Sequence, residues 1–341
     1  MRSDARLMSA SGASAGTETR RDRPPCAFLS DIGVSAGRSV AIAELVQEGA
    51  DASALRALED DGFEAYQQSD EDVVQLARSA MAASLAKSSA APGDVDAVVF
   101  GVESLIDAAK GLAGPERTLP QIRYELLAIL PDLGMCRALP YGNWLLSCAN
   151  LGSTLTLAKS LVESGQHRRV MVVLSEKYRI ARLMDNEAAV FSDLAVCCTI
   201  GFGEAGFRIK HIVSTATPGL ARPDAILGGE SLGKVLMATV TALKRLEDSF
   251  MQKTGRRPKD CKTIVGGHFH ARSIGILAQL LEIDLPRFRR DARRRFAHAY
   301  AADNLLTLSD IDDGGGLASG DEILLVNAGI WAWSLILLEK V

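Results

Sequence analysis

The chain has 341 residues, 48% of them hydrophobic, and carries a net charge of −4 with a pI near 5.8. This length and composition predict one large α/β unit or two fused domains, and the acidic balance argues against nucleic acid as a general partner. The longest apolar run, residues 323–338, is interrupted by Asn327 and Gly329 and falls short of the roughly 18 residues that a membrane span needs. We therefore expect buried strands there and no membrane helix.

The cysteines and the N-terminus suggest where the protein resides. Six cysteines, at positions 26, 136, 148, 197, 198 and 261, show no CxxC spacing. This pattern predicts a reduced, cytoplasmic protein without a zinc site. Residues 1–25 are rich in Ser, Ala and Arg and lack the apolar stretch of a secretory signal, so we expect a disordered tail.

Strands and helices are predicted to alternate through the first part of the chain. An amphipathic helix begins near residue 69, with Ser69 or Asp70 as its N-cap. A longer excursion over 106–140 contains a helical segment at 124–133. The other elements expected here are strands at 26–34, 94–104, 143–147, 168–176 and 191–203, and a helix at 150–164.

The second part repeats this scheme. Its predicted helices are 231–255, 271–282 and 301–312, and its predicted strands are 262–269, 322–329 and 331–340. Alternating β-α-β units of this kind predict a layered α/β architecture with mostly buried sheets.

Cys148 stands between an apolar run and the small-residue start of the 150–164 helix, in the sequence LLSCANLGSTLTLAKS. Free N–H groups and the positive end of the helix would stabilise a thiolate at such a junction. The alternative is a buried, inert cysteine. Inertness is the favoured interpretation for Cys197 and Cys198, which lie in a strand of small apolar residues.

The order of the segments resembles the thiolase superfamily, in its ketoacyl synthase III-like branch. The segments that carry the resemblance are EDVVQLARSAMAASLAKSSAAPGDVDAVVFG, SCANLGSTLTLAKSLVESGQHRRVMVVLSE, FSDLAVCC and NAGIWAWS. The resemblance implies an αβαβα arrangement of two pseudo-duplicated halves, residues 26–205 with the nucleophile and 206–341 with its partners. It also implies an acyl carrier protein or CoA thioester as acyl donor, no cofactor and no metal.

Within this resemblance, the segment AHAYAADN departs from the condensing enzymes, which have Gly-Asn here. His298 takes the place of the Asn, and Asp303 follows five residues on. This pattern resembles ketosynthase III-like acyltransferases of antibiotic pathways, which use a Cys-His-Asp triad to move an acyl group onto a hydroxyl. Cys148, His298 and Asp303 are therefore the expected triad, with a hydroxyl or amine of a small molecule as acceptor. A structural hydrogen bond between His298 and Asp303 is the alternative.

Two other functions stay open. A decarboxylating condensing enzyme would use His268 or His270, in the turn GGHFHARS, to stabilise an enolate. A catalytically silent subunit would pair with an active homologue. The acyl group, and the choice between carrier protein and CoA as donor, are not defined by the sequence.

Further assignments follow from the resemblance. The backbone N–H groups of Cys148 and Gly329 are the expected oxyanion donors, and Asn327 is expected to be a strand-end cap. Arg290, Arg294 and Arg295 would dock the acidic carrier protein or CoA phosphates, with a solvated helix face as the alternative. We expect a homodimer in which the apolar stretch CCTIGFG, residues 197–203, forms the contact.

Overall fold

The computed structural model describes residues 26–102, 119–177, 182–184, 188–203, 205–221 and 232–341. The predicted tail at 1–25 lies outside the described residues, as does the first part of the predicted excursion after residue 105. Among the described residues, no helix is both long and apolar enough to cross a bilayer.

The first half of the chain forms one side of a large mixed sheet. Its strands, outward from the middle of the sheet, are β1 (Phe28–Ala36), β7 (Leu194–Gly201), β6 (Arg169–Glu176), β4 (Ala97–Gly101) and β5 (Leu139–Gly142). β7 is antiparallel to both β1 and β6, whereas β6, β4 and β5 run parallel.

The second half forms the other side with the same arrangement. Outward from the middle, its strands are β8 (Phe207–Ala216), β12 (Ala332–Lys340), β11 (Glu322–Ala328), β9 (Thr263–Gly266) and β10 (Phe288–Arg289). β12 is antiparallel to both β8 and β11, and β11, β9 and β10 run parallel. The order and direction of the strands therefore repeat, which confirms the pseudo-duplicated fold. In the described part of the chain, β1 is paired with β8 through two residue pairs, Phe28 with Arg208 and Leu29 with Phe207.

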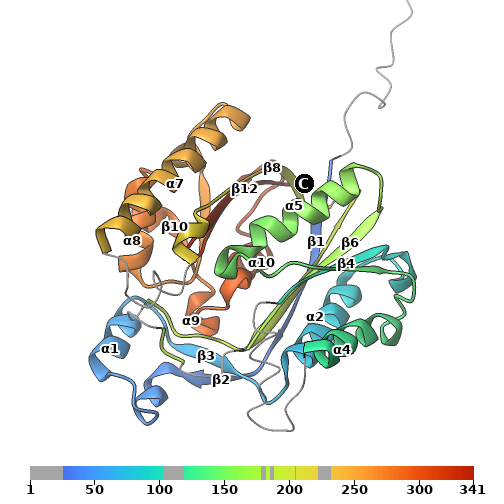
Figure 1. Cartoon of the computed structure of the whole chain (residues 1–341), viewed down its shortest axis with the longest axis horizontal. Coiled ribbons are helices and arrows are strands. Elements are labelled where there is room, and N and C mark those ends of the chain that lie inside the picture. Colours follow the sequence, from blue (N-terminus) through green and yellow to red (C-terminus); the bar gives the residue numbers. More distant parts are fainter. Residues whose placement is uncertain (1–25, 103–118, 178–181, 185–187, 204, 222–231) are drawn as a thin grey trace, which may run out of the picture.

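Helices form three layers around the two halves of the sheet (Figure 1). α5 (Asn150–Glu163) and α10 (Asp303–Asp313) lie centrally, and their leucines share one core with inward residues of both halves, such as Val99 and Leu325. The outer helices are α2 (Val73–Lys87) and α4 (Leu119–Asp132) on the first half, and α7 (Leu232–Thr254) and α8 (Ala271–Leu280) on the second.

The layering follows from the alternation of side chains along a strand. In β4, Val99 faces the central helices, while Val98 and Phe100 face α2 and α4. Each strand therefore contributes to two cores at once, and this explains why the strands are apolar throughout. The expected αβαβα layering is confirmed.

A small unit beside the central layers had no counterpart among the predicted elements. It consists of β2 (Arg38–Ala41) paired with β3 (Ala65–Gln68), and α1 (Ala52–Asp60), around a core that includes Phe63 and Tyr66. β3 contacts the short helix α9 (Arg293–Phe296), so this unit supports the chain just before His298.

Three predictions about elements were wrong. The segment NWLLS is not a strand: β5 ends at Gly142 and the chain then turns, with Trp144 and Leu145 exposed. The N-cap of α2 is Asp72, whose carboxylate accepts the N–H groups of Val74 and Gln75. β7 lies between β1 and β6, so residues 197–201 cannot form a dimer contact.

Candidate active site

The turn that carries Cys148 is fastened to the helix that follows it. After β5 the chain enters a single 3-10 turn, η3 (Ser147–Ala149), which leads directly into α5. The Asn150 Nδ2 donates to the carbonyl of Asn143 at 2.5 Å, and the Asn143 Nδ2 donates to the hydroxyl of Thr154 at 3.1 Å. These two amides set the position of the nucleophile turn relative to the start of α5.

Cys148 itself is buried at this junction, with 7% of its surface exposed. In the described part of the chain its backbone N–H has no hydrogen-bond acceptor, as expected at the start of a helix. Its carbonyl accepts a hydrogen bond from the Asn327 Nδ2 at 2.9 Å. Asn327 is therefore not a strand-end cap, as we had expected, but a link between β11 and the nucleophile turn.

The structure brings the three expected triad residues together. The Cys148 Sγ lies 3.3 Å from the His298 Nε2, and the His298 Nδ1 lies 2.6 Å from the Asp303 Oδ2. The carboxylate can only accept when ionised, so Nδ1–H donates to it and Nε2 is left facing the sulfur. Cys148 precedes α5 and the other two residues lie at the start of α10, so the contact joins the two halves of the chain.

The His298 imidazole is held on several sides. Its backbone N–H donates to the Val190 carbonyl at 2.8 Å. The rings of Phe269, Phe191 and Tyr300 lie with their centroids 4.4, 5.6 and 5.6 Å from that of the imidazole. An aromatic enclosure of this kind restricts rotation of the ring and keeps water from it.

Burial and charge act in opposite directions on the triad. Burial favours a lower pKa for His298, but the Asp303 carboxylate and Cys148 outweigh it and raise the pKa to about 10. Burial would likewise raise the pKa of Asp303, but His268, His298 and their hydrogen bonds lower it. At neutral pH His298 therefore carries a proton on both nitrogens between an ionised Asp303 and the sulfur.

Asp303 is also fixed by the backbone. Its Oδ1 accepts the Ala299 N–H at 2.6 Å, and its Oδ2 accepts the His268 N–H at 2.6 Å. A carboxylate with three donors keeps one orientation and stays ionised although it is buried.

Neither of the other candidate histidines contacts Cys148. The buried His268 donates its Nδ1–H to the Ala297 carbonyl at 2.6 Å and accepts at Nε2 from the Thr307 hydroxyl at 2.8 Å. Burial lowers the pKa of His268, so we treat it as neutral. His270 is the N-cap of α8 and accepts the Arg272 N–H. The structure therefore separates both residues from the sulfur.

Gly329 lies against the nucleophile turn, but its N–H is already used. It donates to the Ala332 carbonyl at 2.9 Å, which does not support the predicted oxyanion role. A Cβ at this position would lie 3.1 Å from the Ala149 N and 3.2 Å from the Leu146 carbonyl oxygen. Glycine is thus suited to this position because β11 ends in close contact with the turn.

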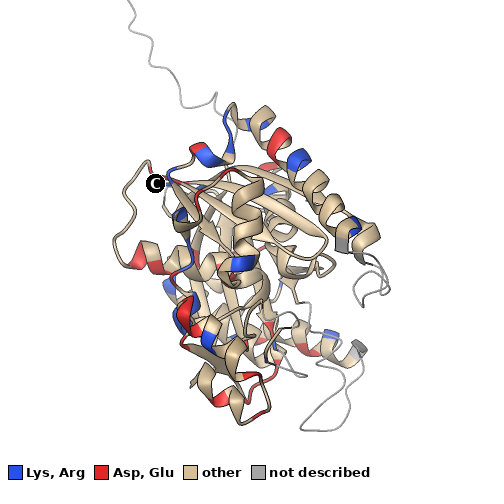
Figure 2. Ribbon diagram, turned by 90° about the vertical axis from the view of Figure 1, so that its left-hand side faces the viewer, with Lys and Arg blue, Asp and Glu red and all other residues tan. Residues whose placement is uncertain are grey.

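The predicted docking arginines differ from one another. Arg290 is buried and binds the Asp61 carboxylate and the Phe269 carbonyl, so its assignment to a docking surface is wrong. Arg294 and Arg295 are exposed, and each pairs with a carboxylate, of Glu64 and Asp310 respectively. Basic and acidic residues are interspersed on the side of the molecule seen in Figure 2, which fits such pairing.

Two of the other cysteines in the first half, those in β7, behave as expected. Cys197 and Cys198 are fully buried in β7, and burial raises the pKa of Cys197 to about 12. Their thiols therefore stay protonated and away from solvent.

Two residues at this site, Ser147 and Thr307, were not predicted from the sequence. Ser147, directly before Cys148, has a positive φ of 51° and its hydroxyl lies 3.7 Å from the sulfur. Thr307, which donates to His268, was predicted only as part of the helix at 301–312. A hydroxyl residue next to a candidate nucleophile is the one signal that could have been noticed.

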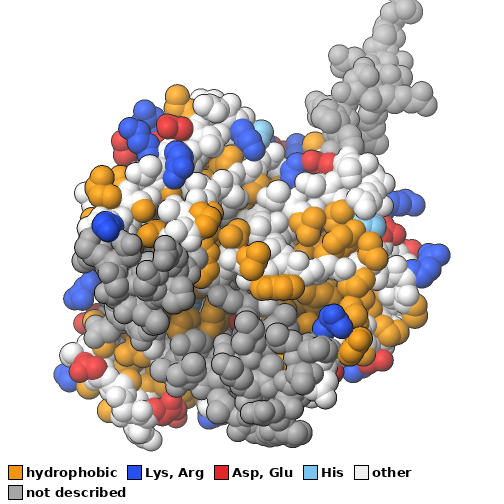
Figure 3. All heavy atoms as spheres, in the orientation of Figure 1, with side chains coloured by type: hydrophobic (Ala, Val, Ile, Leu, Met, Phe, Trp, Pro, Cys, Tyr) orange, Lys and Arg blue, Asp and Glu red, His pale blue; other side chains and the backbone are white. Residues whose placement is uncertain are grey.

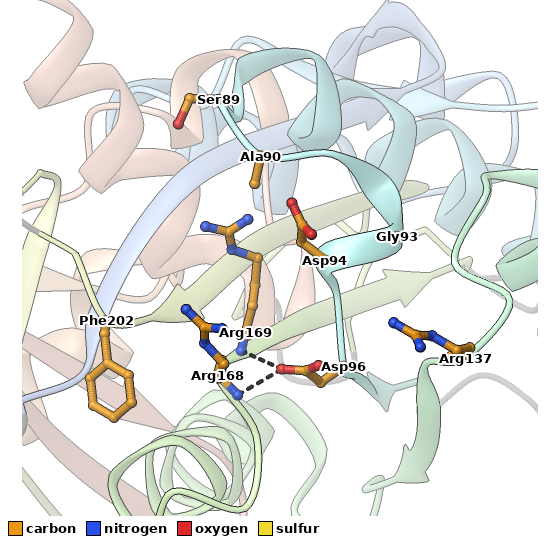
Figure 4. A pocket seen from close by; sticks show the side chains of 9 residues that line it. All are labelled: Ser89, Ala90, Gly93, Asp94, Asp96, Arg137, Arg168, Arg169 and Phe202. Carbon is orange, nitrogen blue, oxygen red and sulfur yellow. Dashed lines mark hydrogen bonds between the residues drawn. The ribbon is translucent and has the colours of Figure 1, made fainter.

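A separate cavity of about 470 Å³ lies at the amino-terminal ends of β4 and β6 (Figure 4). Three arginines line it: Arg137, Arg168 and Arg169. These residues precede β5 and β6 or begin β6, whereas Cys148 follows the carboxyl end of β5.

Comparison with solved structures gives matches over nearly the whole chain. ChlB3, described as an acyltransferase, matches with a TM-score of 0.76 and 18% identity, covering 93% of this chain and 98% of that one. The 3-oxoacyl-[acyl-carrier-protein] synthase III of Aquifex aeolicus VF5 matches with a TM-score of 0.72 and 17% identity, covering 92% and 100%. OleA of Xanthomonas campestris matches with a TM-score of 0.69 and 14% identity, covering 93% and 98%.

No protein-family model and no curated protein matches this sequence. At identities this low, the structural matches establish the fold. The chain has the thiolase-type fold of ketoacyl synthase III-like proteins, as its sequence predicted.

Proposed function

We propose that this protein is an acyltransferase that carries an acyl group on Cys148 and passes it to a hydroxyl or amine. The observation that carries the proposal is the continuous chain of contacts from the Cys148 sulfur through His298 to Asp303. An ionised carboxylate fixes the imidazole, and the imidazole faces the nucleophile, which is the arrangement of a nucleophilic triad.

The first half-reaction loads the enzyme. The Cys148 sulfur, whose proton His298 holds on Nε2, attacks the carbonyl carbon of a thioester, and a C–S bond forms as negative charge moves to oxygen. When the carbonyl re-forms, the bond to the donor's sulfur breaks. The departing thiolate takes the proton from Nε2 and leaves as a thiol, so His298 is left neutral.

The second half-reaction uses that neutral imidazole. The raised pKa of His298 depends partly on Cys148, and the acylated sulfur carries no charge. His298 can then take the proton of an acceptor O–H or N–H whose oxygen or nitrogen attacks the acyl carbon. Collapse expels the Cys148 thiolate beside the newly protonated imidazole, which restores the resting state and releases an ester or amide.

The same geometry argues against the other two functions. Condensation would place His268 or His270 beside the sulfur, yet His268 is engaged with Ala297 and Thr307, and His270 caps α8. A silent subunit would have no requirement for an assembled triad. The fold is similar to both an acyltransferase and condensing enzymes. Our choice between acyl transfer and condensation therefore depends on this local geometry.

The related structures support the proposed donor and setting. The matches include 3-oxoacyl-[acyl-carrier-protein] synthases and a priming β-ketosynthase of the R1128 polyketide pathway. Accordingly, acyl-CoA or an acyl carrier protein supplies the acyl group here, and the product belongs to secondary metabolism in the cytoplasm. The loops on either side of Cys148 expose Trp144, Leu145 and Ile330, an apolar border suited to an acyl-pantetheine arm. On the face drawn in Figure 3, hydrophobic side chains gather over the centre and right, with charged residues mostly towards the margin.

A homodimer is part of the proposal, but through a different surface from the one first expected. With β7 inside the sheet, the outermost strand of the first half among the described residues is β5, where Leu139 is half exposed. An unpaired strand edge of this kind can pair with a second copy about a two-fold axis.

Intact-protein mass spectrometry with a panel of acyl-CoAs and acyl carrier proteins tests the proposal. Wild-type protein should gain the mass of one acyl group, and an added nucleophilic acceptor should remove it as an ester or amide. Stoichiometric release of carbon dioxide from a malonyl donor during turnover would instead show that carbon–carbon bonds are made.

A further inference from the structure

Two features of the structure extend beyond the triad, and the first concerns the oxyanion. Each tetrahedral adduct of acyl transfer places negative charge on an oxygen that needs preorganised hydrogen-bond donors. The Cys148 N–H has no acceptor in the described residues and is one such donor. The Gly329 N–H donates to Ala332, so the second donor has to come from elsewhere.

The Ser147 hydroxyl is in the right place to provide it. Its Oγ lies 3.7 Å from the Cys148 Sγ and is oriented to donate to it, and the residue is buried with 7% of its surface exposed. When Cys148 is acylated, the carbonyl oxygen of the acyl group lies close to the sulfur. A hydroxyl as near to the sulfur as that of Ser147 can therefore reach this oxygen. Catalytic hydrogen bonds are often long in a free enzyme and shorten when charge develops.

The backbone at Ser147 supports a functional role. Its φ of 51° lies in the left-handed region, where a residue with a Cβ costs about 1–2 kcal/mol. Glycine would adopt this conformation without strain, yet the chain has serine, and its hydroxyl is directed to the sulfur. Backbone strain of this type is concentrated at functional sites.

We infer that Ser147 is a catalytic residue that donates its hydroxyl hydrogen first to the Cys148 thiolate and then to the oxyanion of both tetrahedral adducts. The hydrogen stays on Ser147 throughout, so the proton transfers through His298 are unchanged. The inference rests on the proposed acyl transfer.

Two variants separate the hydroxyl from the backbone. Ser147→Ala removes only the hydroxyl, and Ser147→Gly removes the hydroxyl and the strain as well. Both should acylate Cys148 about 100-fold more slowly than wild type, the cost of one oxyanion donor. Acylation by either folded variant within twofold of wild type would overturn the inference.

A second readout applies if wild-type protein accepts no acyl donor, in which case the proposed function fails by itself. The rate of Cys148 alkylation by iodoacetamide is then followed against pH. Loss of a donor to the thiolate should move the profile of Ser147→Ala and Ser147→Gly to higher pH. Profiles that coincide with wild type would show that the hydroxyl does not act on the sulfur.

The second feature is the cavity of Figure 4, which is independent of the triad. Among the described residues, the Arg137, Arg168 and Arg169 side chains have neither an ion pair nor a hydrogen bond. The Asp96 carboxylate beside them accepts the backbone N–H groups of Arg168 and Arg169, at 2.7 and 3.1 Å. It therefore shapes the turn rather than pairing with a guanidinium.

Elsewhere in the described chain most arginines have partners. Arg182 pairs with Asp193, Arg208 with Glu339 and Arg290 with Asp61. Three unpaired guanidinium groups around one cavity are thus a local exception, and guanidinium binds phosphate through paired hydrogen bonds. Phe202, 44% exposed, adds a flat apolar wall.

We propose that this cavity binds a phosphate-bearing small molecule. It is separate from the acyl site, because the 14 residues of α5 lie between Cys148 and the turn before Arg168, about 21 Å of helix. The cavity volume of about 470 Å³ suits a ligand the size of a nucleotide or diphosphate ester.

Calorimetric titration with inorganic pyrophosphate tests this proposal on the whole protein. Wild type should bind saturably, and Arg137→Gln or Arg169→Gln should each weaken binding about tenfold, the loss of one charged contact. Arg272→Gln, which changes an exposed arginine outside the cavity, should bind as wild type does. Absence of saturable binding, equal affinity in all variants, or binding of an acidic peptide but not of pyrophosphate would overturn the proposal.

Discussion

The two halves of the chain place a strand-to-helix junction at the same point of the repeated topology, and the site is made where the two junctions meet. In the first half β5 leads to α5 through Cys148, and in the second β10 leads to α10 through His298 and Asp303. Positive φ angles occur at Ser147 in one junction and at Ala297 and Tyr300 in the other. Both junctions thus depart from ordinary backbone where chemistry is expected.

The two junctions differ in the groups found at the N-termini of their helices. At α5 the Cys148 N–H, which has no acceptor among the described residues, is left for a charged sulfur or a substrate oxygen. At α10 the Asp303 carboxylate occupies the first turn and satisfies the N–H groups of Ala299 and His268. The duplication therefore provides two equivalent positions, of which one is open to substrate and the other is filled by a buried carboxylate that supports the base.

Removal of the nucleophile should have the largest effect. Cys148→Ala should abolish the acyl adduct, because the other described cysteines in this half are buried in β7 or lie at the surface. Cys136→Ala, which changes an exposed thiol, is the control and should load as wild type does. Full labelling of Cys148→Ala in the mass spectrum would place the nucleophile elsewhere.

The carboxylate of the second junction should matter almost as much. Asp303→Asn removes the charge that fixes the His298 tautomer, and loss of that orientation can slow catalysis up to about 10⁴-fold. Acyl loading should stay measurable while transfer to the acceptor becomes slow. Asp310→Asn, in the same helix but paired with exposed Arg295, is the matched control. A near wild-type transfer rate for Asp303→Asn would contradict the triad.

The link between the halves should have a moderate effect. Asn327→Ala removes the donor to the Cys148 carbonyl and should slow acylation about tenfold, consistent with the 1–3 kcal/mol cost of an unpaired buried polar group. Stopped-flow acylation measures this. Ser334→Ala, opposite Asn327 on β12 and without a partner for its hydroxyl among the described atoms, should keep the wild-type rate. Equal losses in both variants would point to general packing.

The last prediction concerns stability rather than rate, through its dependence on pH. The pKa of His298 is raised to about 10 from 6.5, so its contribution is complete below pH 6.5 and is lost as pH rises towards 10. The free energy of unfolding of wild type, measured in urea relative to His298→Gln, should therefore fall between these two values. A difference that stays constant or rises over that range would show that His298 is neutral in the folded protein.

Much of the fold was predictable because helical spacing and apolar runs are both visible within short stretches of sequence. Helical spacing identified α2, α5, α7, α8 and α10, and apolar runs identified the long strands of each half. The segment NWLLS misled us, since an apolar run in a turn has the composition of a strand. Its true state depends on amide contacts from Asn143 and Asn150 to groups several residues away.

The site was predictable only where spacing carried information. His298 and Asp303 are five residues apart, and this interval was visible in the sequence. The roles of Arg290 and Asn327 depend on Asp61 and Cys148, more than 170 residues away in the chain, and no local pattern reveals such partners. Gly329 was predicted as an oxyanion donor, but its N–H donates to the Ala332 carbonyl within its own turn.

The short ladder between β1 and β8 affects how the proposed activity would respond to changes far from the site. Beyond two residue pairs there, the halves are joined by the shared core, in which leucines of α5 and α10 pack with strand residues of both halves. Cys148 belongs to one half and His298 to the other. The distance between the sulfur and the imidazole therefore depends on how the two halves are placed relative to each other. A change such as Leu155→Ala, remote from every reacting atom, would then alter the distance for proton transfer between the sulfur and the imidazole. The turnover rate can therefore change during evolution without any substitution in the triad.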